Sequence, residues 1–177
     1  LPGSGVVAER SGPPGWLAVA ESARVPLRHA PGLSLSYAQE PPPQLALYTD
    51  GDAMSAIVRD DGAQGRWLEA MTSALPYRVR RPDSVLVLGA GGGMEVLQAL
   101  VLGAREVDAV ELSSQRLRLV REDFAAYTGR LFRDRRVRTF VAEPRAVARA
   151  SGRHYDLIVL AGGESFASGG AGVQSAS

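Results

Sequence analysis

The sequence has no cysteine, which excludes disulfides, thiolate nucleophiles and cysteine metal ligands. It also lacks lysine, so all 20 basic residues are arginine. Histidine is scarce: the chain has two, His29 and His154, and neither is spaced to share a metal with a second histidine or a pair of carboxylates. We therefore predict a protein without a metal site.

An excess of one charge is also missing, as are long apolar runs. The formal net charge is +1, which gives no electrostatic reason to expect a nucleic-acid partner. Five arginines do crowd the segment 130–138. We interpret that segment as a solvated loop between a helix and a strand, with a phosphate-binding patch as the alternative. No apolar run approaches the roughly 18 residues of a membrane span, so we expect a soluble, cytoplasmic protein with no membrane partner.

The chain length favours one domain with a small appendage. With 177 residues, 45% of them hydrophobic, the chain can bury a substantial core. From the composition along the chain we predict a flexible lead-in at 1–15, a small β domain at 16–60, a linking helix at 61–82, a nucleoside-binding domain at 83–166 and a flexible tail at 167–177.

The first part of the chain has strand-like patterns. Short apolar or alternating runs occupy 16–22, 33–38, 44–49 and 53–58, separated by proline and glycine turns. Such runs predict a small antiparallel β element, with Asp50-Gly51 as a hairpin turn because both residue types tolerate positive φ.

A helical pattern follows this β element. Trp67, Met71 and Leu75 recur at helical spacing, and Pro76 then interrupts the pattern. We predict one amphipathic helix that links the two parts of the chain.

The second part alternates strand with helix. Strands are predicted at 85–88, 107–112, 137–142 and 155–160, and the helices between them at 94–102, 113–129 and 144–150. Gly103 is placed to end the first helix, and Ser113 or Ser114 to begin the second. Right-handed crossovers predict a parallel, Rossmann-like α/β sheet in the order 3-2-1-4. The last strand would then be an edge with unpaired backbone groups.

The most informative motif is the glycine-rich turn after the first parallel strand. Gly89, Ala90, Gly91 and Gly93 let a backbone approach a ligand closely, and the helix after them offers free N–H groups. The alternative is a tight turn that binds nothing. No lysine follows, which excludes a phosphate loop of the Walker A type, and Met94 stands where a dinucleotide fingerprint needs glycine.

Two acids end the next two strands at the same edge. Glu111 can accept hydrogen bonds from both hydroxyls of a ribose, or it can be an exposed acid at a strand end. Glu143 can bind an adenine amino group, or it can interact with the dipole of the helix that Pro144 begins.

These motifs together resemble the class I S-adenosylmethionine-dependent transferases, in particular spermidine synthases and the proteins related to them. The resemblance covers nearly everything from Trp16 to Phe166: the small β domain with the hairpin LALYTDG, the aromatic-x-Glu motif at Trp67-Leu68-Glu69, the glycine turn, the two strand-end acids and the strand YDLIVLA. It implies a class I methyltransferase fold, truncated after the fourth strand. It also implies S-adenosylmethionine or its decarboxylated form as co-substrate, with a small-molecule amine or another acceptor.

The chain departs from the family pattern at the residues of the chemistry. The family has an acid at the position of Gly92, Asp at Ala161, and Asp-Pro at Glu164-Ser165. Glu164 and Glu69 remain as acids that could face a polyamine, and Glu164 is the candidate catalytic residue. Because the expected general base is missing, we predict impaired or altered aminopropyl transfer.

Alternative functions follow from these departures. Without an acid at Gly92, binding should favour the decarboxylated nucleoside less than in true spermidine synthases. A methyltransferase is one alternative. Another is a non-catalytic relative, acting in ligand sensing or assembly, with the β element as a homodimer surface. We also expect the chain to be a fragment of a longer protein.

Overall fold

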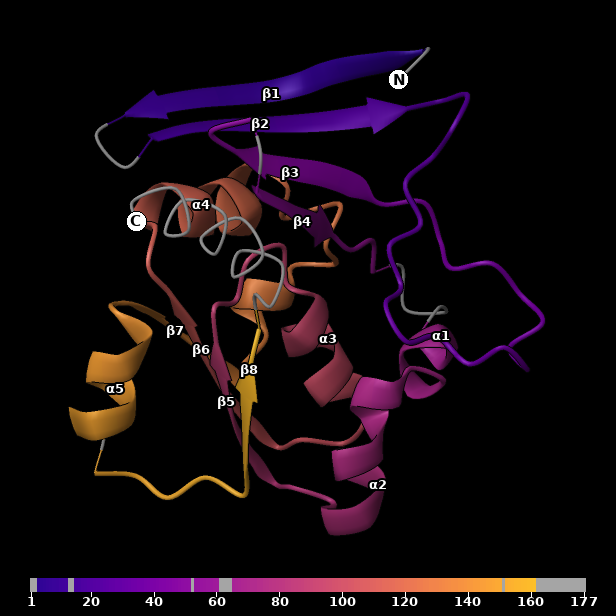
Figure 1. Ribbon diagram of the computed structural model, residues 1–177. Coiled ribbons are helices and arrows are strands. Elements are labelled where there is room, and N and C mark those ends of the chain that lie inside the picture. The colour runs from indigo at the N-terminus through magenta and orange to yellow at the C-terminus, as the bar shows by residue number, and fades with distance from the viewer. Residues whose placement is uncertain (1–2, 13–14, 52, 61–64, 151, 162–177) are drawn as a thin grey trace, which may run out of the picture.

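Two β-sheets form the framework of the protein. The computed structural model describes residues 3–12, 15–51, 53–60, 65–150 and 152–161. An antiparallel sheet lies across one end of a parallel sheet, and α4 (Ser114–Arg118) lies between them (Figure 1). The carboxyl ends of the parallel strands therefore face the antiparallel sheet.

The antiparallel sheet is a four-stranded meander in the order β1-β2-β3-β4. Its strands are β1 (Ser4–Gly12), β2 (Gly15–Ser22), β3 (Leu45–Thr49) and β4 (Ala53–Ile57). The predicted hairpin turn is confirmed, since Asp50 and Gly51 both have positive φ, of 52° and 78°. The predicted flexible lead-in is wrong over β1, which pairs with β2 along its whole length.

The connection between β2 and β3 lacks the predicted strand at 33–38. These residues form turns and bends, and Leu33 makes a single bridge to Met71. Leu35 is fully exposed, so the alternating pattern does not correspond to a buried face. The prediction fails because alternation alone gives a segment no neighbouring strand to pair with.

The predicted single linking helix is broken into short pieces. They are α1 (Arg66–Glu69), the 3-10 turn η1 (Thr72–Ala74) and α2 (Leu75–Arg80). Met71 is extended between the first two pieces, which lets its backbone bridge to Leu33. Pro76 lies in the first turn of α2, where a missing N–H does no harm, so it begins a helix and does not end one.

The parallel sheet has the predicted order. Its strands are β5 (Ser84–Leu88), β6 (Glu106–Glu111), β7 (Val137–Val141) and β8 (Leu157–Leu160), arranged β7-β6-β5-β8. This arrangement is 3-2-1-4 along the chain, and the α/β fold class is confirmed. Gly103 follows α3 (Met94–Val101) with φ of 97°, as predicted for a helix end.

Helices cover the two faces of this sheet unequally. On one face, α3 and the segment after α4, which includes the π-helical turn η2 (Leu119–Asp123), join the main core around Val85, Val87 and Val107. On the other face, α5 (Pro144–Ala150) covers a small cluster of Leu86, Leu88 and Val110. The main core also contains residues of β2, β3 and β4, so the two sheets share one hydrophobic interior.

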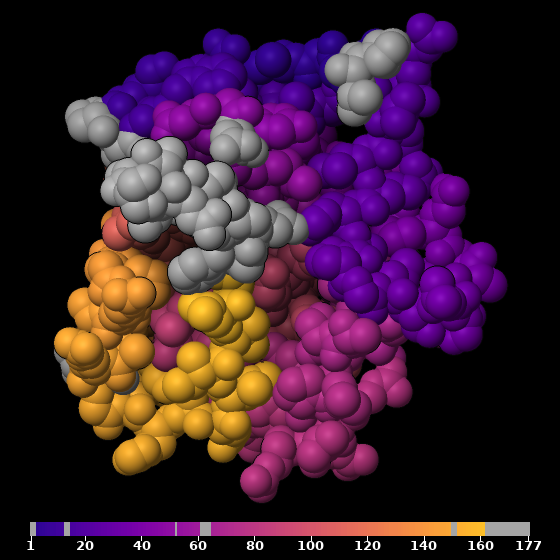
Figure 2. Space-filling view, viewed as in Figure 1, coloured from indigo at the N-terminus to yellow at the C-terminus, as the bar shows by residue number. Residues whose placement is uncertain are grey.

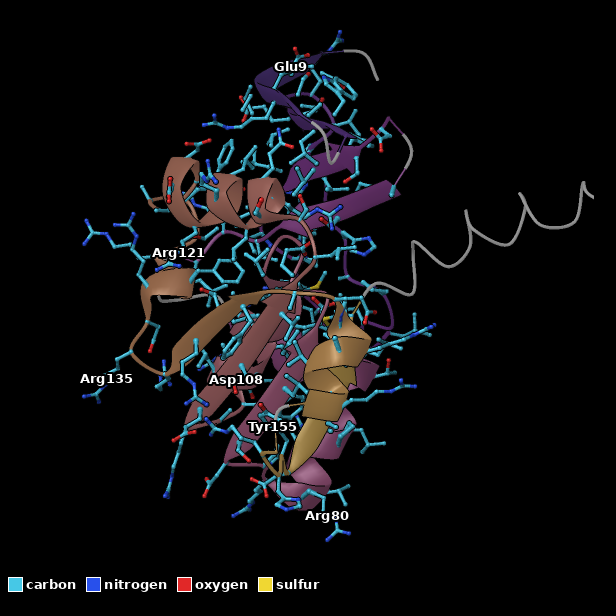
Figure 3. The ribbon with its side chains drawn as sticks, turned by 90° about the vertical axis from the view of Figure 1, so that its left-hand side faces the viewer. Glu9, Arg80, Asp108, Arg121, Arg135 and Tyr155 are labelled. Carbon is cyan, nitrogen blue, oxygen red and sulfur yellow. The ribbon has the colours of Figure 1, made fainter. Side chains whose placement is uncertain are left out.

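A network of charged and polar side chains around Asp108 lies on the face of the parallel sheet that α5 covers. Asp108 is only 2% exposed, and its carboxylate accepts two hydrogen bonds from Arg138 and one, of 2.7 Å, from the Tyr155 hydroxyl. Figure 3 shows Asp108 and Tyr155 lying next to each other on this face. Because each oxygen of the buried acid has a donor, its charge is compensated.

Strand β8 lies at the edge of the described sheet. Among the described residues it pairs with β5 alone, and Ile158 and Leu160 on it are 55% and 66% exposed. Figure 2 shows this strand, in yellow, at the surface. At its start the Asp156 carboxylate accepts hydrogen bonds from the backbone N–H groups of Asp83 and Ser84 and from the Ser84 hydroxyl. Asp156 thereby fastens β8 to β5.

These hydrogen bonds predict a pH-dependent contribution of Asp156 to stability. Donors from the backbone and hydroxyl of Ser84 hold the pKa of Asp156 below its usual value. The contribution should be complete above about pH 4, the usual range of an unfolded aspartate, and should disappear as pH falls through the lowered pKa. We expect Asp156→Asn to lower Tm by a few degrees at pH 7, with a difference from wild type that shrinks as the pH falls through the lowered pKa of Asp156. Thermal melts of both proteins, followed by circular dichroism from pH 7 to 2.5, would measure the difference in Tm. A difference that stays constant with pH would contradict a role for the Asp156 carboxylate charge.

Within the described residues, no helix is both long and apolar enough to cross a membrane.

Candidate functional site

The glycine-rich turn leads from β5 into α3 at the carboxyl edge of the parallel sheet. The N–H groups of Gly89 and Ala90 both donate to the carbonyl of Val110 on β6, at 2.8 and 2.9 Å. Gly89 and Gly93 have φ of 89° and 98°, a region that side chains with a Cβ rarely enter. The backbone of the turn is therefore fixed against the neighbouring strand.

Strand β4 covers one side of this turn. A Cβ on Gly92 would lie 2.0 Å from the carbonyl oxygen of Ala56 and 2.8 Å from the backbone nitrogen of Ile57. Next to it, Gly93 and Ile57 form an isolated antiparallel bridge. Glycine at position 92 is thus required by the close approach of another backbone, and there is no space for the acid that the family pattern would place there.

Glu111 lies beside the turn, as predicted from its position at the end of β6. It is 2% exposed, so it is not an exposed strand-end acid. Its Oε2 accepts a hydrogen bond of 3.0 Å from the Gly91 N–H, and its Oε1 accepts one of 2.9 Å from the Ser113 N–H. The structure therefore brings Gly89, Ala90, Gly91, Gly93 and Glu111 together at one edge.

Arg116 is a residue of this site that the sequence did not point to. Its Nη1 lies 3.4 Å from Oε1 of Glu111, and its Nη2 donates to the Thr49 hydroxyl at 2.7 Å. Ser113 begins α4 by accepting a hydrogen bond from the Arg116 N–H, which puts Arg116 in the first turn of the helix. Arg116 thus links Glu111, at the end of β6, to the end of β3.

The guanidinium of Arg116 is not fully satisfied in this position. Its Nε is buried and has no hydrogen-bond partner among the described residues. A buried donor without a partner costs free energy, so other positions of this side chain are accessible at little additional cost.

The remaining predicted site residues lie apart from this group. Glu143 is exposed and accepts a hydrogen bond of 2.8 Å from the Ala146 N–H, which makes it the cap of α5. This geometry supports the helix-acid alternative, and a contact between Glu143 and adenine stays a prediction. Glu164 lies outside the described residues. Glu69 is exposed at the end of α1, whereas Leu68 before it is fully buried.

Two cavities accompany the site, and neither is lined by a described residue of the 89–93 turn or by Glu111. The smaller, of about 280 Å³, lies beside the first turn of α3, between Met94, Tyr77 and strand β8. The larger, of about 530 Å³, lies near the other end of α3. Within the described part of the chain, no group of three or more acidic or histidine side chains is arranged to hold a metal ion.

Comparison with known proteins gives matches in structure only. No family model matches the chain, and no curated protein matches its sequence. A spermidine synthase solved in complex with the transition state analogue AdoDATO is 15% identical, with a TM-score of 0.60 over 88% of this chain and 46% of its own. Spermidine synthase from Thermotoga maritima is also 15% identical, with a TM-score of 0.57 over 88% of this chain and 47% of its own.

These matches establish the fold. The chain has the fold of spermidine synthase, including the small antiparallel sheet ahead of the parallel one, as the sequence resemblance implied. The chain spans less than half of the length of each of these two structures.

Proposed function

We propose that this protein binds an adenosyl sulfonium nucleoside, S-adenosylmethionine or its decarboxylated form, at the edge formed by the glycine turn and Glu111. The observation that carries the proposal is the hydrogen bond from the Gly91 N–H to the buried carboxylate of Glu111. This bond sets an acceptor for ribose hydroxyls beside a turn that a nucleoside can approach closely. The spermidine synthase fold supports the same assignment.

The carboxylate of Glu111 has limited capacity for a ribose. A carboxylate has about four lone-pair sites, and here Gly91, Ser113 and Arg116 already donate to it. A ribose with two hydroxyls needs two acceptor sites. Because the contact with Arg116 is the longest of the three, at 3.4 Å, we propose that this guanidinium moves away when the nucleoside binds.

The reaction we propose is a transfer from the sulfonium to a small acceptor, an amine or another nucleophile. Glycine at position 92 leaves no acid to attract the ammonium of a decarboxylated ligand or to repel the carboxylate of S-adenosylmethionine. The transferred group is therefore either aminopropyl or methyl. Glu164 is the candidate residue to hold or deprotonate the acceptor.

A second candidate function is a non-catalytic role in ligand sensing or assembly. The observation that favours it is the packing of the Ala56 backbone against Gly92, which closes part of the edge with the protein's own chain. In this proposal the antiparallel sheet serves as a homodimer surface. Nucleoside binding distinguishes a live ligand site, whether in a transferase or in a sensor, from a purely structural role.

We predict that the protein binds these nucleosides and that Arg116→Gln binds them more tightly. In the free protein the variant loses the contact of Arg116 with Glu111, whereas in the complex the ribose hydroxyls replace that contact. The substitution therefore destabilises the free protein and leaves the complex unchanged. The affinity for the nucleoside should rise about threefold to tenfold, equivalent to roughly 1 kcal/mol of binding free energy. Isothermal titration calorimetry with S-adenosylmethionine, its decarboxylated form and methylthioadenosine would measure it.

The matched control is Arg118→Gln, which removes the same charge from an exposed side chain in the same helix. Its affinity should equal that of wild type. A strong preference for the decarboxylated nucleoside would contradict the inference from Gly92. No binding of any of the three by wild type or by Arg116→Gln would overturn the nucleoside-binding proposal and favour the structural role.

A further inference from the structure

The larger cavity forms a second site, separate from the nucleoside edge. Its volume of about 530 Å³ falls within the range of roughly 300–1,000 Å³ that small-molecule sites occupy. It lies near the C-terminal end of α3, whereas the glycine turn precedes the N-terminus of the same helix. The described residues that line it come from the β4–α1 connection, from α3 and from the segment 129–136: Arg59, Asp60, Gly65, Leu97, Leu100, Val101, Gly129, Arg130, Leu131, Arg133, Asp134 and Arg136.

Positive charge dominates the polar lining, with four arginines against two aspartates. Arg136 binds both oxygens of Asp134, so these two charges compensate each other, and this contact lowers the pKa of Asp134. The guanidinium groups of Arg59, Arg130 and Arg133 form no hydrogen bond or ion pair with any described residue. All three are exposed, so they are free to meet a ligand.

The arginines are not needed to satisfy the end of α3. Carbonyl groups at a helix C-terminus attract cations, which could explain positive charge at this place. Here, however, the carbonyls of Gln98, Ala99 and Leu100 already accept hydrogen bonds from the backbone N–H groups of residues 102–104. Three guanidinium groups that have no partner among the described residues therefore remain for another anion.

Part of the cavity lining is apolar. Leu97, Leu100 and Leu131 belong to it, and each is less than 10% exposed. A ligand that fills this space has to combine an apolar body with an anionic end. A guanidinium has a planar fork of donors that fits phosphate oxygens, and several such groups around one cavity suit a doubly charged anion.

We infer that this cavity binds a phosphate monoester carried on an apolar or aromatic body. The arginine-rich segment 130–138 is then divided in function. Arg130 and Arg133 line the cavity, whereas Arg135 points away from the molecule (Figure 3). The phosphate-binding alternative for this segment therefore applies to Arg130 and Arg133. The solvated-loop interpretation applies to Arg135.

Binding of phenyl phosphate tests this assignment. Isothermal titration calorimetry at low ionic strength should show one site in the wild-type protein, with inorganic phosphate and benzoate binding at least tenfold more weakly. Arg133→Gln and Arg59→Gln should each raise the Kd for phenyl phosphate about tenfold or more. Arg135→Gln, which removes the same charge from the same segment, should leave the Kd unchanged.

Three results would overturn the assignment. One is the absence of phenyl phosphate binding by the wild-type protein at millimolar concentration. Another is an equal loss of affinity in Arg135→Gln and Arg133→Gln, because it would indicate a general effect of net charge. The third is benzoate binding as tightly as phenyl phosphate. The described lining contains neither Glu111 nor a residue of the 89–93 turn, so these measurements report on a different part of the molecule from the nucleoside titrations.

Discussion

Replacing Gly92 with alanine is expected to lower the free energy of unfolding by about 3 kcal/mol or more. The added Cβ would lie 2.0 Å from the carbonyl oxygen of Ala56, closer than any real contact. Ala56 belongs to β4, which is paired with β3, and the turn that contains Gly92 is held by the hydrogen bonds of Gly89 and Ala90 to Val110. Neither backbone can move away without breaking some of these hydrogen bonds. Denaturant unfolding followed by tryptophan fluorescence would measure the change.

Two other glycines separate crowding from backbone strain. Gly103 has φ of 97° and nothing within 4 Å of an added Cβ, so Gly103→Ala should cost about 1 kcal/mol from strain alone. Gly5 has neither a positive φ nor a near neighbour, and Gly5→Ala should leave stability unchanged. If Gly92→Ala were no more destabilising than Gly103→Ala, the close approach of β4 to Gly92 would not be what requires glycine there. The protein would then also be expected to tolerate Gly92→Asp, which introduces the acid of the family pattern.

Replacing Glu111 with alanine is expected to cost about 3 kcal/mol of stability and to abolish nucleoside binding. The change removes the acceptor of the Gly91 and Ser113 N–H groups and takes the carboxylate away from the Arg116 guanidinium. Removing one member of a buried charged pair costs roughly 3–5 kcal/mol, and partial exposure of the donors places this site at the lower end. Urea unfolding and calorimetric titration at low temperature, where the variant is folded, would measure both effects.

Glu106→Ala is the matched control, because Glu106 begins the same strand and its ion pairs are exposed at the surface. It should cost less than about 1 kcal/mol and leave nucleoside binding intact. Glu111→Gln keeps the size of the side chain and should also lose binding, since its amide nitrogen would face an N–H donor. Retained binding in both Glu111 variants would show that the nucleoside binds elsewhere.

The parallel half of the fold could be predicted from the sequence because its rules are local or general. A few adjacent residues mark each of its main features: the apolar strand β5, Gly103 after α3 and Ser113 before α4. The handedness of crossovers then leaves one sheet order. The position of Glu111 beside the turn follows from that order.

The antiparallel half was harder to predict. Strand β1 has polar and exposed residues on both faces, so no periodicity marks it, and it is held by backbone pairing with β2. The segment 33–38 shows the opposite case, in which alternation is present but no strand lies beside it. Both outcomes are decided by neighbours in space, which a local pattern does not contain.

The missed parts of the site depend on contacts between distant residues. Arg116 reaches Thr49 across 67 positions of the chain, and Gly92 meets the backbone of Ala56. Neither contact has a sequence signature. The arginines at 130 and 133 were visible as a cluster, but only the fold brings them to one cavity with Arg59 and apolar side chains.

The position of β8 beside β5 has a consequence for the order in which the chain acquires its structure. Strand β5 lies at the centre of the parallel sheet, yet the hydrogen bonds that join Asp156 to Ser84 connect residues 72 positions apart. During synthesis, β5 can pair with β6 soon after both emerge from the ribosome, but its second edge stays open until β8 has been made. Closing so long a loop is entropically costly and slow, so β8 should be the last of the four described parallel strands to join the sheet. Until β8 joins, β5 and β7 each leave one backbone edge of the sheet unpaired. The nascent chain is then most exposed to pairing with strands of other chains.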